Sequence, residues 1–553
     1  MFLKRINCLI FIILVGSLSI NAIPESNKRT FKISKNLSIF NALFRELDLF
    51  YVDTLSYDKM MKSTIEDMLE KLDPYTVYLP EEETDDLTFM TTGEYAGIGS
   101  LIMKRDNNIY ISEPYEGMPA QRNDVRAGDI ILEVDGKNVQ KMTVSEVSSL
   151  LKGIPNTNIK LLLKRYGENK NIEKSFLREK IQINPVSFST AVAEKTGYVL
   201  LSEFTDKSAY ELKTVILEMI KQKQITSLII DLRNNGGGLI DEAVKILGYF
   251  LPKGTEVVTT KGKSIQDQRI YKTPSDPLFP DLQLVVITNR SSASASEILA
   301  GALQDLDRGV IVGERTFGKG LVQNIRPIGY GGHLKVTTAK YYIPSGRCIQ
   351  SLDYSHRNED GSVGRVPDSL TSEFSTRNGR KVRDGGGITP DKISKDERML
   401  NIAYYIYAQN HYFDFATQYV TKHPTIAKPT EFKLTDEEFN LFTNYLLEKK
   451  FNYTSQTEKY YSELLEIAKF EGLDTLARNE FEALKKKLIP DITKNIEDNK
   501  TEISELLSLE IIKRYYFQKG VIEYSLRTDK DLNLALDVIK NEETYNSILK
   551  KAN

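Results

Sequence analysis

The sequence predicts a multidomain α/β protein in which a segment of alternating strands and helices follows a smaller unit of short strands, with helical regions on both sides. Three observations support this prediction. From about Lys195, apolar strands alternate with helices, which is typical of helices covering a largely parallel sheet. Between about Gly93 and Tyr166, short apolar runs are separated by glycine and Asp-Gly turns. Before this unit and after Leu400, apolar residues recur at helical spacing.

The length and composition are those of an ordinary globular protein. The 553 residues are too many for one core, so several domains are expected. With 41% apolar and 27% charged residues, the chain is neither a disordered tail nor a fibre. A formal charge of −2 gives no indication of a nucleic-acid partner.

The first 22 residues have the pattern of a secretory signal peptide. Lys4 and Arg5 precede an apolar run over residues 6–20, and the small residue Ala22 follows. This run is shorter than the roughly 20 apolar residues that a membrane span needs. We therefore expect export to the periplasm or cell envelope, with cleavage after Ala22 or, alternatively, an uncleaved, membrane-associated anchor.

Changes of pattern along the chain give the expected domain boundaries. They are a signal peptide at 1–22, an N-terminal helical region at 30–90, the short-strand domain at 91–168, the α/β domain at 180–350, a loop or hairpin that returns to the α/β domain at 351–395, and a C-terminal helical domain at 396–553. Within the α/β domain, strands are expected over 198–201, 227–232, 282–288 and 310–312, and helices over 209–222, 240–250 and 294–305.

The two cysteines predict no internal disulfide. Cys8 would leave with the signal peptide, so Cys348 would be the remaining thiol of an exported chain. Cys348 could act as a nucleophile only beside a suitable base.

A glycine-rich run, Asn234–Gly238, follows an apolar strand and precedes a helix. Glycines at such a turn allow backbone N–H groups to face a phosphate or the oxyanion of an acyl-transfer intermediate. Taken by itself, the run is explained equally well by a plain strand-to-helix turn.

A serine-rich run, Ser291–Glu297, also lies between a strand and a helix. Ser294 and Glu297 have the spacing of a capping box, which is the structural explanation of the run. The small residues around Ser294 also suit an exposed nucleophile at a sharp turn. The run alone leaves both interpretations open.

Lys319 lies between two glycines and ahead of an apolar strand, an unusual place for a solvated charge. Gly313, Gly318 and Lys319 have the spacing of a phosphate-binding loop. However, Gly320 occupies the position where Ser or Thr would hold magnesium, and a strand follows instead of a helix. An ATPase or GTPase is therefore not expected.

A serine nucleophile needs a proton acceptor, and histidine is poorly placed to provide it. Of the four histidines, only His333 lies in the α/β part, on a turn, and no Gly-x-Ser-x-Gly sequence occurs. Lys319 is the available alternative, since burial can lower the pKa of a lysine from about 10.4 towards 7 or 8.

Taken together, these segments resemble the C-terminal processing peptidases, or tail-specific proteases, over about residues 35–350, with 384–391 continuing the match. The resemblance implies that Ser294 is the nucleophile, that Lys319 is the general base, and that Gln323 orients the lysine. It also implies an oxyanion hole formed by the backbone amides of Ala295 and Gly237, and a catalytic domain of the crotonase type.

The same resemblance identifies the short-strand domain as a PDZ domain, which binds an extended chain end at a sheet edge. The loop over the substrate carboxylate would be formed by Ala96, Gly97, Ile98 and Gly99. One departure from the family is Arg122-Asn123-Asp124, where small apolar residues are usual.

The function that the resemblance implies is an exported serine endopeptidase that cuts proteins near their C-termini and needs no metal or cofactor. Its partners would be the C-terminal tails of protein substrates, with a homodimer and an adaptor protein as further candidates. Two alternatives remain: a catalytically silent, peptide-binding PDZ scaffold, and a nucleotide-binding enzyme built on Gly313–Lys319.

Overall fold

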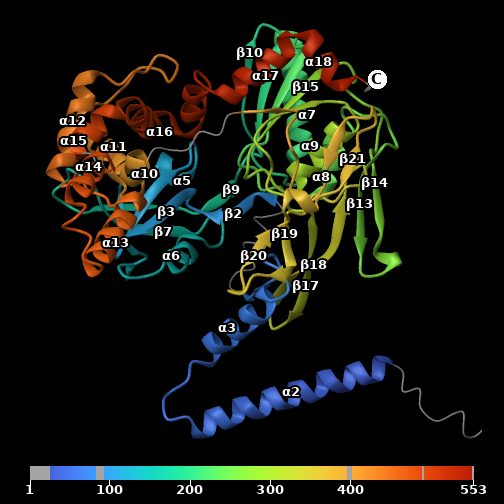
Figure 1. Ribbon diagram of the computed structural model, residues 1–553, viewed down its shortest axis with the longest axis horizontal. Helices are drawn as coiled ribbons and strands as arrows, with labels where there is room; N and C mark the ends of the chain where they lie inside the picture. Colours follow the sequence, from blue (N-terminus) through green and yellow to red (C-terminus); the bar gives the residue numbers. More distant parts are fainter. Residues whose placement is uncertain (1–24, 82–91, 395–400, 489–490, 551–553) are drawn as a thin grey trace, which may run out of the picture. The chain divides into compact units, whose positions relative to one another are not determined.

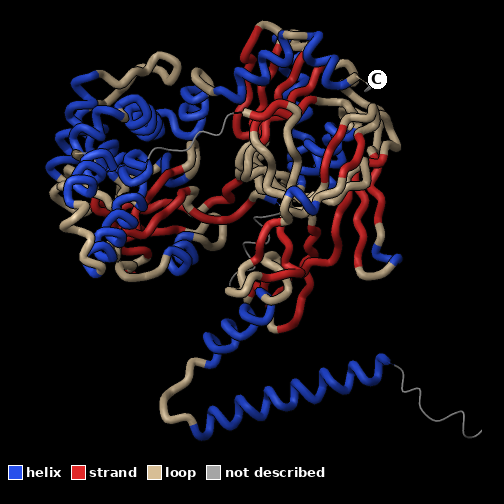
Figure 2. Tube along the Cα trace, in the orientation of Figure 1, coloured by secondary structure: helices blue, strands red, loops and turns tan. Residues whose placement is uncertain are grey.

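The computed structural model describes residues 25–81, 92–394, 401–488 and 491–550 (Figures 1 and 2). The chain divides into two compact units, Met1–Tyr78 and Leu79–Asn553. The expected signal peptide at 1–22 and Cys8 lie outside the described residues. Among the residues described, no helix is both long and apolar enough to cross a membrane.

The first unit contains two helices, α2 (Glu25–Phe50) and α3 (Tyr57–Glu70). The helical region predicted over 30–90 ends earlier, because a short strand, β1 (Val77–Leu79), follows. Asp73 causes this change: its Oδ1 accepts the N–H groups of Tyr75 and Thr76 at 2.8 and 2.9 Å, which forms a turn around a proline. Residues 82–90 of the predicted region are outside the described part.

The short-strand domain is an antiparallel sheet with one core and two helices, α5 (Pro119–Arg122) and α6 (Val144–Leu151). Its strands, in spatial order, are β3 (Ser100–Arg105), β4 (Asn108–Pro114), β5 (Ile130–Val134), β7 (Asn158–Lys164) and β8 (Ile172–Leu177), with β6 (Lys137–Asn138) beside β5. A separate pair, β2 (Glu94–Gly97) and β9 (Glu179–Gln182), follows the same antiparallel pattern. The sheet continues beyond the predicted boundary at 168, because β8 pairs with β7 along its length.

The α/β domain is built on a six-stranded sheet. Its strands, in spatial order, are β10 (Val186–Ala193), β11 (Thr196–Leu201), β12 (Ser227–Asp231), β15 (Gln283–Thr288), β16 (Val310–Gly313) and β23 (Lys392–Ile393). All neighbours are parallel except β10 and β11. The central strands are nearly continuous apolar runs because both of their faces are buried.

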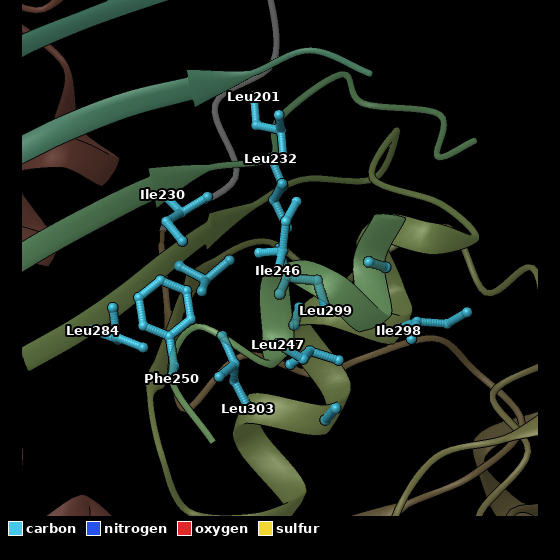
Figure 3. Packing of buried hydrophobic residues seen from close by; sticks show 14 of the residues in the cluster. Leu201, Ile230, Leu232, Ile246, Leu247, Phe250, Leu284, Ile298, Leu299 and Leu303 are labelled. Carbon is cyan, nitrogen blue, oxygen red and sulfur yellow. The ribbon is translucent and has the colours of Figure 1, made fainter. Parts of the chain in front are cut away.

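One face of this sheet is covered by α7 (Ser208–Lys223), α8 (Ile240–Leu247) and α9 (Ala295–Asp305). Figure 3 shows Ile230 and Leu284 of the strands together with Ile246 of α8 and Leu303 of α9. Every residue of α9 is buried, so the helix that begins after Ser294 is held inside the domain.

The opposite face is covered by the last two helices, α17 (Lys530–Lys540) and α18 (Glu542–Leu549), drawn in red beside β10 and β15 in Figure 1. Strand residues such as Ile229 and Val285 form one core with Leu532 and Tyr545. The Tyr545 hydroxyl also accepts the backbone N–H of Leu284 at 2.9 Å. These helices therefore complete the α/β domain, although the sequence predicts them as part of a helical domain.

A second, antiparallel sheet in the same domain contains β13 (Glu256–Gly262), β14 (Arg269–Lys272), β17 (Leu321–Gly329) and β18 (Gly332–Tyr342), with the short 3₁₀ helix η2 (Ile265–Asp267) between β13 and β14. The predicted loop region contains the hairpins β19–β20 (Leu352–Arg357, Val363–Arg365) and β21–β22 (Glu373–Ser375, Lys381–Arg383), with η3 (Asp368–Leu370) between them. The chain then returns as β23 to the edge of the parallel sheet.

Most of the remaining helices contribute to an aromatic core, which includes Tyr412, Phe415, Phe439 and Phe442. The remaining helices are α10 (Asn401–Ala408), α11 (His411–Lys422), α12 (Asp436–Glu448), α13 (Gln456–Phe470), α14 (Arg478–Leu488), α15 (Ile492–Asp498) and α16 (Lys500–Ser525). The last of these is kinked at Phe517, whose φ of 53° is not helical.

If α17 is part of the α/β core, Leu532→Ala will destabilise that domain by about 2–5 kcal/mol, because it opens a cavity against the sheet. Leu532 is 3% exposed. The measurement is urea unfolding followed by circular dichroism. Leu441→Ala is the matched control, since Leu441 is 58% exposed. Equal unfolding midpoints for both variants would contradict the packing of α17 on the sheet.

Candidate active site

Three turns of the α/β domain meet at one edge of the parallel sheet. They follow β12, β15 and β16, and we call them the glycine turn (232–238), the serine turn (289–294) and the lysine turn (314–320). Because these strands are parallel neighbours, their carboxyl ends lie at the same edge. That edge is where open α/β sheets place their ligands.

Ser294 occupies a strained backbone conformation at the start of α9. Its φ of 57° and ψ of −115° lie outside the regions that residues with a side chain normally adopt. Such strain persists only where the surrounding structure imposes it, and it is common at active sites. Glu297 accepts the backbone N–H of Ser294, which is one half of a capping box, but the Ser294 side chain makes no cap hydrogen bond. Ser294 is half-buried.

The carboxylate of Glu297 holds the serine turn and the lysine turn together. Oε2 accepts the backbone N–H of Ser294 at 2.9 Å and that of Lys319 at 2.8 Å. Oε1 accepts the backbone N–H of Gly318 at 2.7 Å and the hydroxyl of Thr316 at 2.5 Å. Glu297 is fully buried; burial raises the pKa of its carboxyl, and these four hydrogen bonds oppose that shift.

This geometry places the backbones of Ser294 and Lys319 close together. Both nitrogens bind the same oxygen atom, so they are no farther apart than two hydrogen bonds laid end to end. It also argues against a phosphate-binding loop, because the N–H groups of Gly318 and Lys319 donate to a carboxylate of the chain itself. The strand β17, not a helix, follows the lysine turn.

The glycine turn is joined to the serine turn through Asn235, which is fully buried. The carbonyl oxygen of Asn235 accepts the Ala293 N–H at 3.0 Å and the Ser296 hydroxyl at 2.9 Å. Its side-chain Nδ2 donates to the Leu201 carbonyl at 2.7 Å. Two hydrogen bonds of the Asn235 carbonyl therefore join the glycine turn to the segment around Ser294.

Gly237 lies directly against the proposed nucleophile. Its φ is 101°, and a Cβ at this position would lie 2.7 Å from the Cβ of Ser294 and 2.9 Å from the nitrogen of Ala295. The N–H of Ala295, the first residue of α9, has no acceptor within the helix. The N–H of Gly237 donates to Asn235 Oδ1 at 2.9 Å. Both predicted oxyanion residues therefore lie beside Ser294, with one of the two amides already hydrogen-bonded.

Gln323 lies in β17, four residues after Lys319, and is half-buried. Its Nε2 donates to the Thr337 hydroxyl at 3.2 Å, across the pairing of β17 with β18. Lys319 is half-buried between Gly318 and Gly320, and a Cβ at either glycine would collide with residues 350–351. The role of Gln323 in orienting Lys319 stays a prediction.

Other candidate groups have less support. The thiol of Cys348 is half-buried, and burial raises its pKa. Across the described part of the chain, no group of three or more His, Cys, Asp or Glu side chains is arranged to hold a metal ion.

Of the predicted carboxylate loop, Ala96 and Gly97 are the last residues of β2, and Ile98 and Gly99 connect β2 to β3. Its carbonyl groups bond within the domain: Ala96 accepts from Gly153 at 3.2 Å, Ile98 from Ala120 at 2.8 Å, and Gly99 from Tyr115 at 2.9 Å. Of the described strands, only β4 pairs with β3, and α6 lies beside it. An edge strand next to a helix is the arrangement that accepts an added peptide strand.

The charged residues that depart from the family pattern are paired with other charges. Arg122 forms an ion pair with Glu179. Burial alone would raise the pKa of Asp124, but hydrogen bonds from Arg126, Arg165 and Lys174 lower it to about 2. These side chains therefore serve as structural ion pairs of the domain.

The sequence predicts no separate role for Asn235, and it predicts only a capping role for Glu297. The position of Asn235 directly before the three glycines is the sequence feature that could have indicated its role. For Glu297, no sequence signal indicates contacts with the lysine turn, which lies about 20 residues later and is joined to it by tertiary structure.

Sequence comparison identifies the family. The profile of peptidase family S41 matches residues 195–354, a PDZ domain matches 110–165, and the C-terminal helical domain of a probable PDZ-protease matches 402–539. A carboxy-terminal-processing protease from Bartonella bacilliformis is 36% identical over 321 residues, which cover 58% of this chain and 73% of that protein. The chain belongs to peptidase family S41. It is a serine-type peptidase of the C-terminal processing group, with a PDZ domain and a C-terminal helical region.

Two further proteins are similar to this S41 peptidase, one in the sequence comparison and one among solved structures. A probable CtpA-like serine protease from Staphylococcus aureus is 35% identical over 318 residues, which cover 57% of this chain and 62% of that protein. Among solved structures, the photosystem II D1 C-terminal processing protease is 28% identical, with a TM-score of 0.35; the match covers 64% of this chain and 92% of that one.

If Gly237 must lie against Ser294, Gly237→Ala will lower the peptidase activity by about 100-fold, because the added methyl group displaces the serine turn. Gly236→Ala is the matched control: a Cβ there meets nothing within 4 Å. The measurement is kcat/KM for a peptide reporter. Equal kcat/KM values for the two variants would show that contact with Ser294 is not what makes Gly237 necessary.

Proposed function

We propose that this S41 peptidase is an exported endopeptidase that uses a Ser294–Lys319 dyad to cut proteins near their C-termini. The observation that carries the proposal is the Glu297 carboxylate, whose Oε2 binds the backbone nitrogens of both residues. A nucleophile and its base must lie within reach of each other, and a buried link between their backbones favours such an arrangement.

In the proposed reaction, Ser294 Oγ attacks the peptide carbonyl while the uncharged Lys319 amine takes the hydroxyl proton. The tetrahedral oxyanion forms beside the N–H of Ala295, where the N-terminus of α9 favours negative charge. The N–H of Gly237 would be the second donor, once it shares or leaves its bond to Asn235. Lys319 then protonates the leaving amine, and water hydrolyses the acyl-enzyme. Gln323 would orient the lysine.

We also propose that the PDZ domain receives the C-terminal tail of the substrate. The free edge of β3, the adjoining α6 and the loop formed by Ala96, Gly97, Ile98 and Gly99 support this role. Export by the segment at 1–22 to the periplasm or cell envelope, a homodimer and an adaptor protein remain predictions, as does the relation of the catalytic sheet to the crotonase group.

The dyad is tested by Ser294→Ala and Lys319→Ala. Each variant is expected to reduce the cleavage of a tailed protein reporter by about 1,000-fold or more, because removal of either member disables the unit. Ser291→Ala and Lys263→Ala are matched controls at exposed positions. Circular dichroism checks that each variant folds. Near-normal cleavage by either dyad variant would refute the assignment. The same result is expected if the protein is a silent scaffold and a contaminating protease cuts the reporter.

Tail recognition is tested with two reporters that differ only at the C-terminus. Replacing the free carboxylate by a carboxamide is expected to raise KM about tenfold with little change in kcat, since it removes a charge-assisted contact made equally in the ground and transition states. Acetylation of the reporter N-terminus is the control and should leave KM unchanged. Equal KM values for both C-termini would count against the carboxylate loop.

A further inference from the structure

An arginine joins the glycine turn to the end of β12. The backbone N–H of Arg233 donates to Asp231 Oδ1 at 2.9 Å, and its Nε donates to Oδ1 and Oδ2 at 3.0 and 2.9 Å. Asp231 is 1% exposed and also accepts a hydrogen bond from the Tyr198 hydroxyl at 2.7 Å. The residue that immediately precedes Asn234–Gly238 is therefore fixed to the sheet.

The other side of the same guanidinium binds the start of α17. Nη1 and Nη2 donate to Oδ1 and Oδ2 of Asp529 at 3.1 and 2.6 Å, and Nη1 also donates to Asp531 at 3.1 Å. Two parallel bonds between a guanidinium and a carboxylate fix orientation as well as distance. Asp529 is the N-cap of α17, where it accepts the Leu532 N–H at 3.0 Å.

The cluster has little access to water. The exposed side-chain fractions are 1% for Asp231, 10% for Asp529, 18% for Asp531 and 21% for Arg233. Burial alone would lower the pKa of Arg233, but Asp231 and Asp529 raise it, so the guanidinium stays charged. Without Asp529 and Asp531, Arg233 would keep its ion pair with Asp231 but would lose the hydrogen bonds that hold its other side to α17.

Asn235 links the fixed position of Arg233 to the residues around Ser294. It lies two residues after Arg233, its carbonyl holds Ala293 of the serine turn, and its Oδ1 accepts the N–H of Gly237. A rotation of the chain at Arg233 would therefore change the position of Gly237 relative to Ser294.

We propose that Arg233, held by Asp529 and Asp531, is a positioning residue for the peptidase reaction, and that the start of α17 is thus a functional part of the catalytic domain. Arg233 acts through Asn235 and Gly237 and does not contact the peptide. The inference rests on the proposed role of the glycine turn at the oxyanion.

The test uses the full chain with the double change Asp529→Asn and Asp531→Asn, which removes two charges while keeping side-chain size. We expect kcat to fall about 10- to 100-fold while KM changes less than about twofold, because a small misplacement affects the transition state and not peptide binding. Asp529→Glu keeps the carboxylate and should restore most of kcat relative to Asp529→Asn. Asp537→Asn, at an exposed position of the same helix, is the matched control and should match the parent.

The outcomes separate this inference from the proposed dyad. An unchanged kcat in the double variant, together with an inactive Ser294→Ala, overturns the role of Arg233 and leaves the dyad intact. A loss of kcat that equals the loss of folded protein, or a loss confined to KM, also overturns it. If the double variant does not fold, Arg233→Lys and the single change Asp531→Asn are judged by the same kcat criterion.

Discussion

The buried carboxylate of Glu297 is the interaction on which the candidate active site depends. A carboxylate removed from water is costly unless donors surround it. Here those donors come from Ser294, Thr316, Gly318 and Lys319, in two separate turns. The hydrogen bonds that stabilise the Glu297 carboxylate therefore also align the serine turn with the lysine turn. It also accounts for the strained backbone of Ser294, because its N–H must face inward to reach Oε2.

This arrangement explains why the serine and lysine runs were each ambiguous in the sequence. The spacing of Ser294 and Glu297 predicts a capping box, and the spacing of Gly313 and Lys319 nearly matches a phosphate loop. The structure contains part of each: a glutamate that accepts the N–H of Ser294, and a glycine-flanked loop whose N–H groups bind an anion. The anion belongs to the chain itself. Only the two runs together indicate one site.

Much of the fold follows from local patterns, and the rest depends on tertiary contacts. Strands such as Ser227–Asp231 and the helix after Ser294 are visible because periodicity and turn residues mark them. The position of α17 cannot be predicted in this way. An amphipathic helix has the same apolar face whether it packs on a helical bundle or on a sheet. The bond from Gly237 to Asn235 likewise depends on a side-chain rotamer that no spacing reveals.

The packing of α17 and α18 has a consequence for the way the protein matures. Residues 532–545 cover the strand residues Tyr198, Ile229 and Val285. The ribosome makes these covering residues long after the strands. Until those residues emerge, one side of the parallel sheet is an uncovered apolar surface, and Arg233 lacks its partners on α17. In a nascent chain, the covered sheet face and the contacts of Arg233 with Asp529 therefore form only after α17 and α18 have been synthesised.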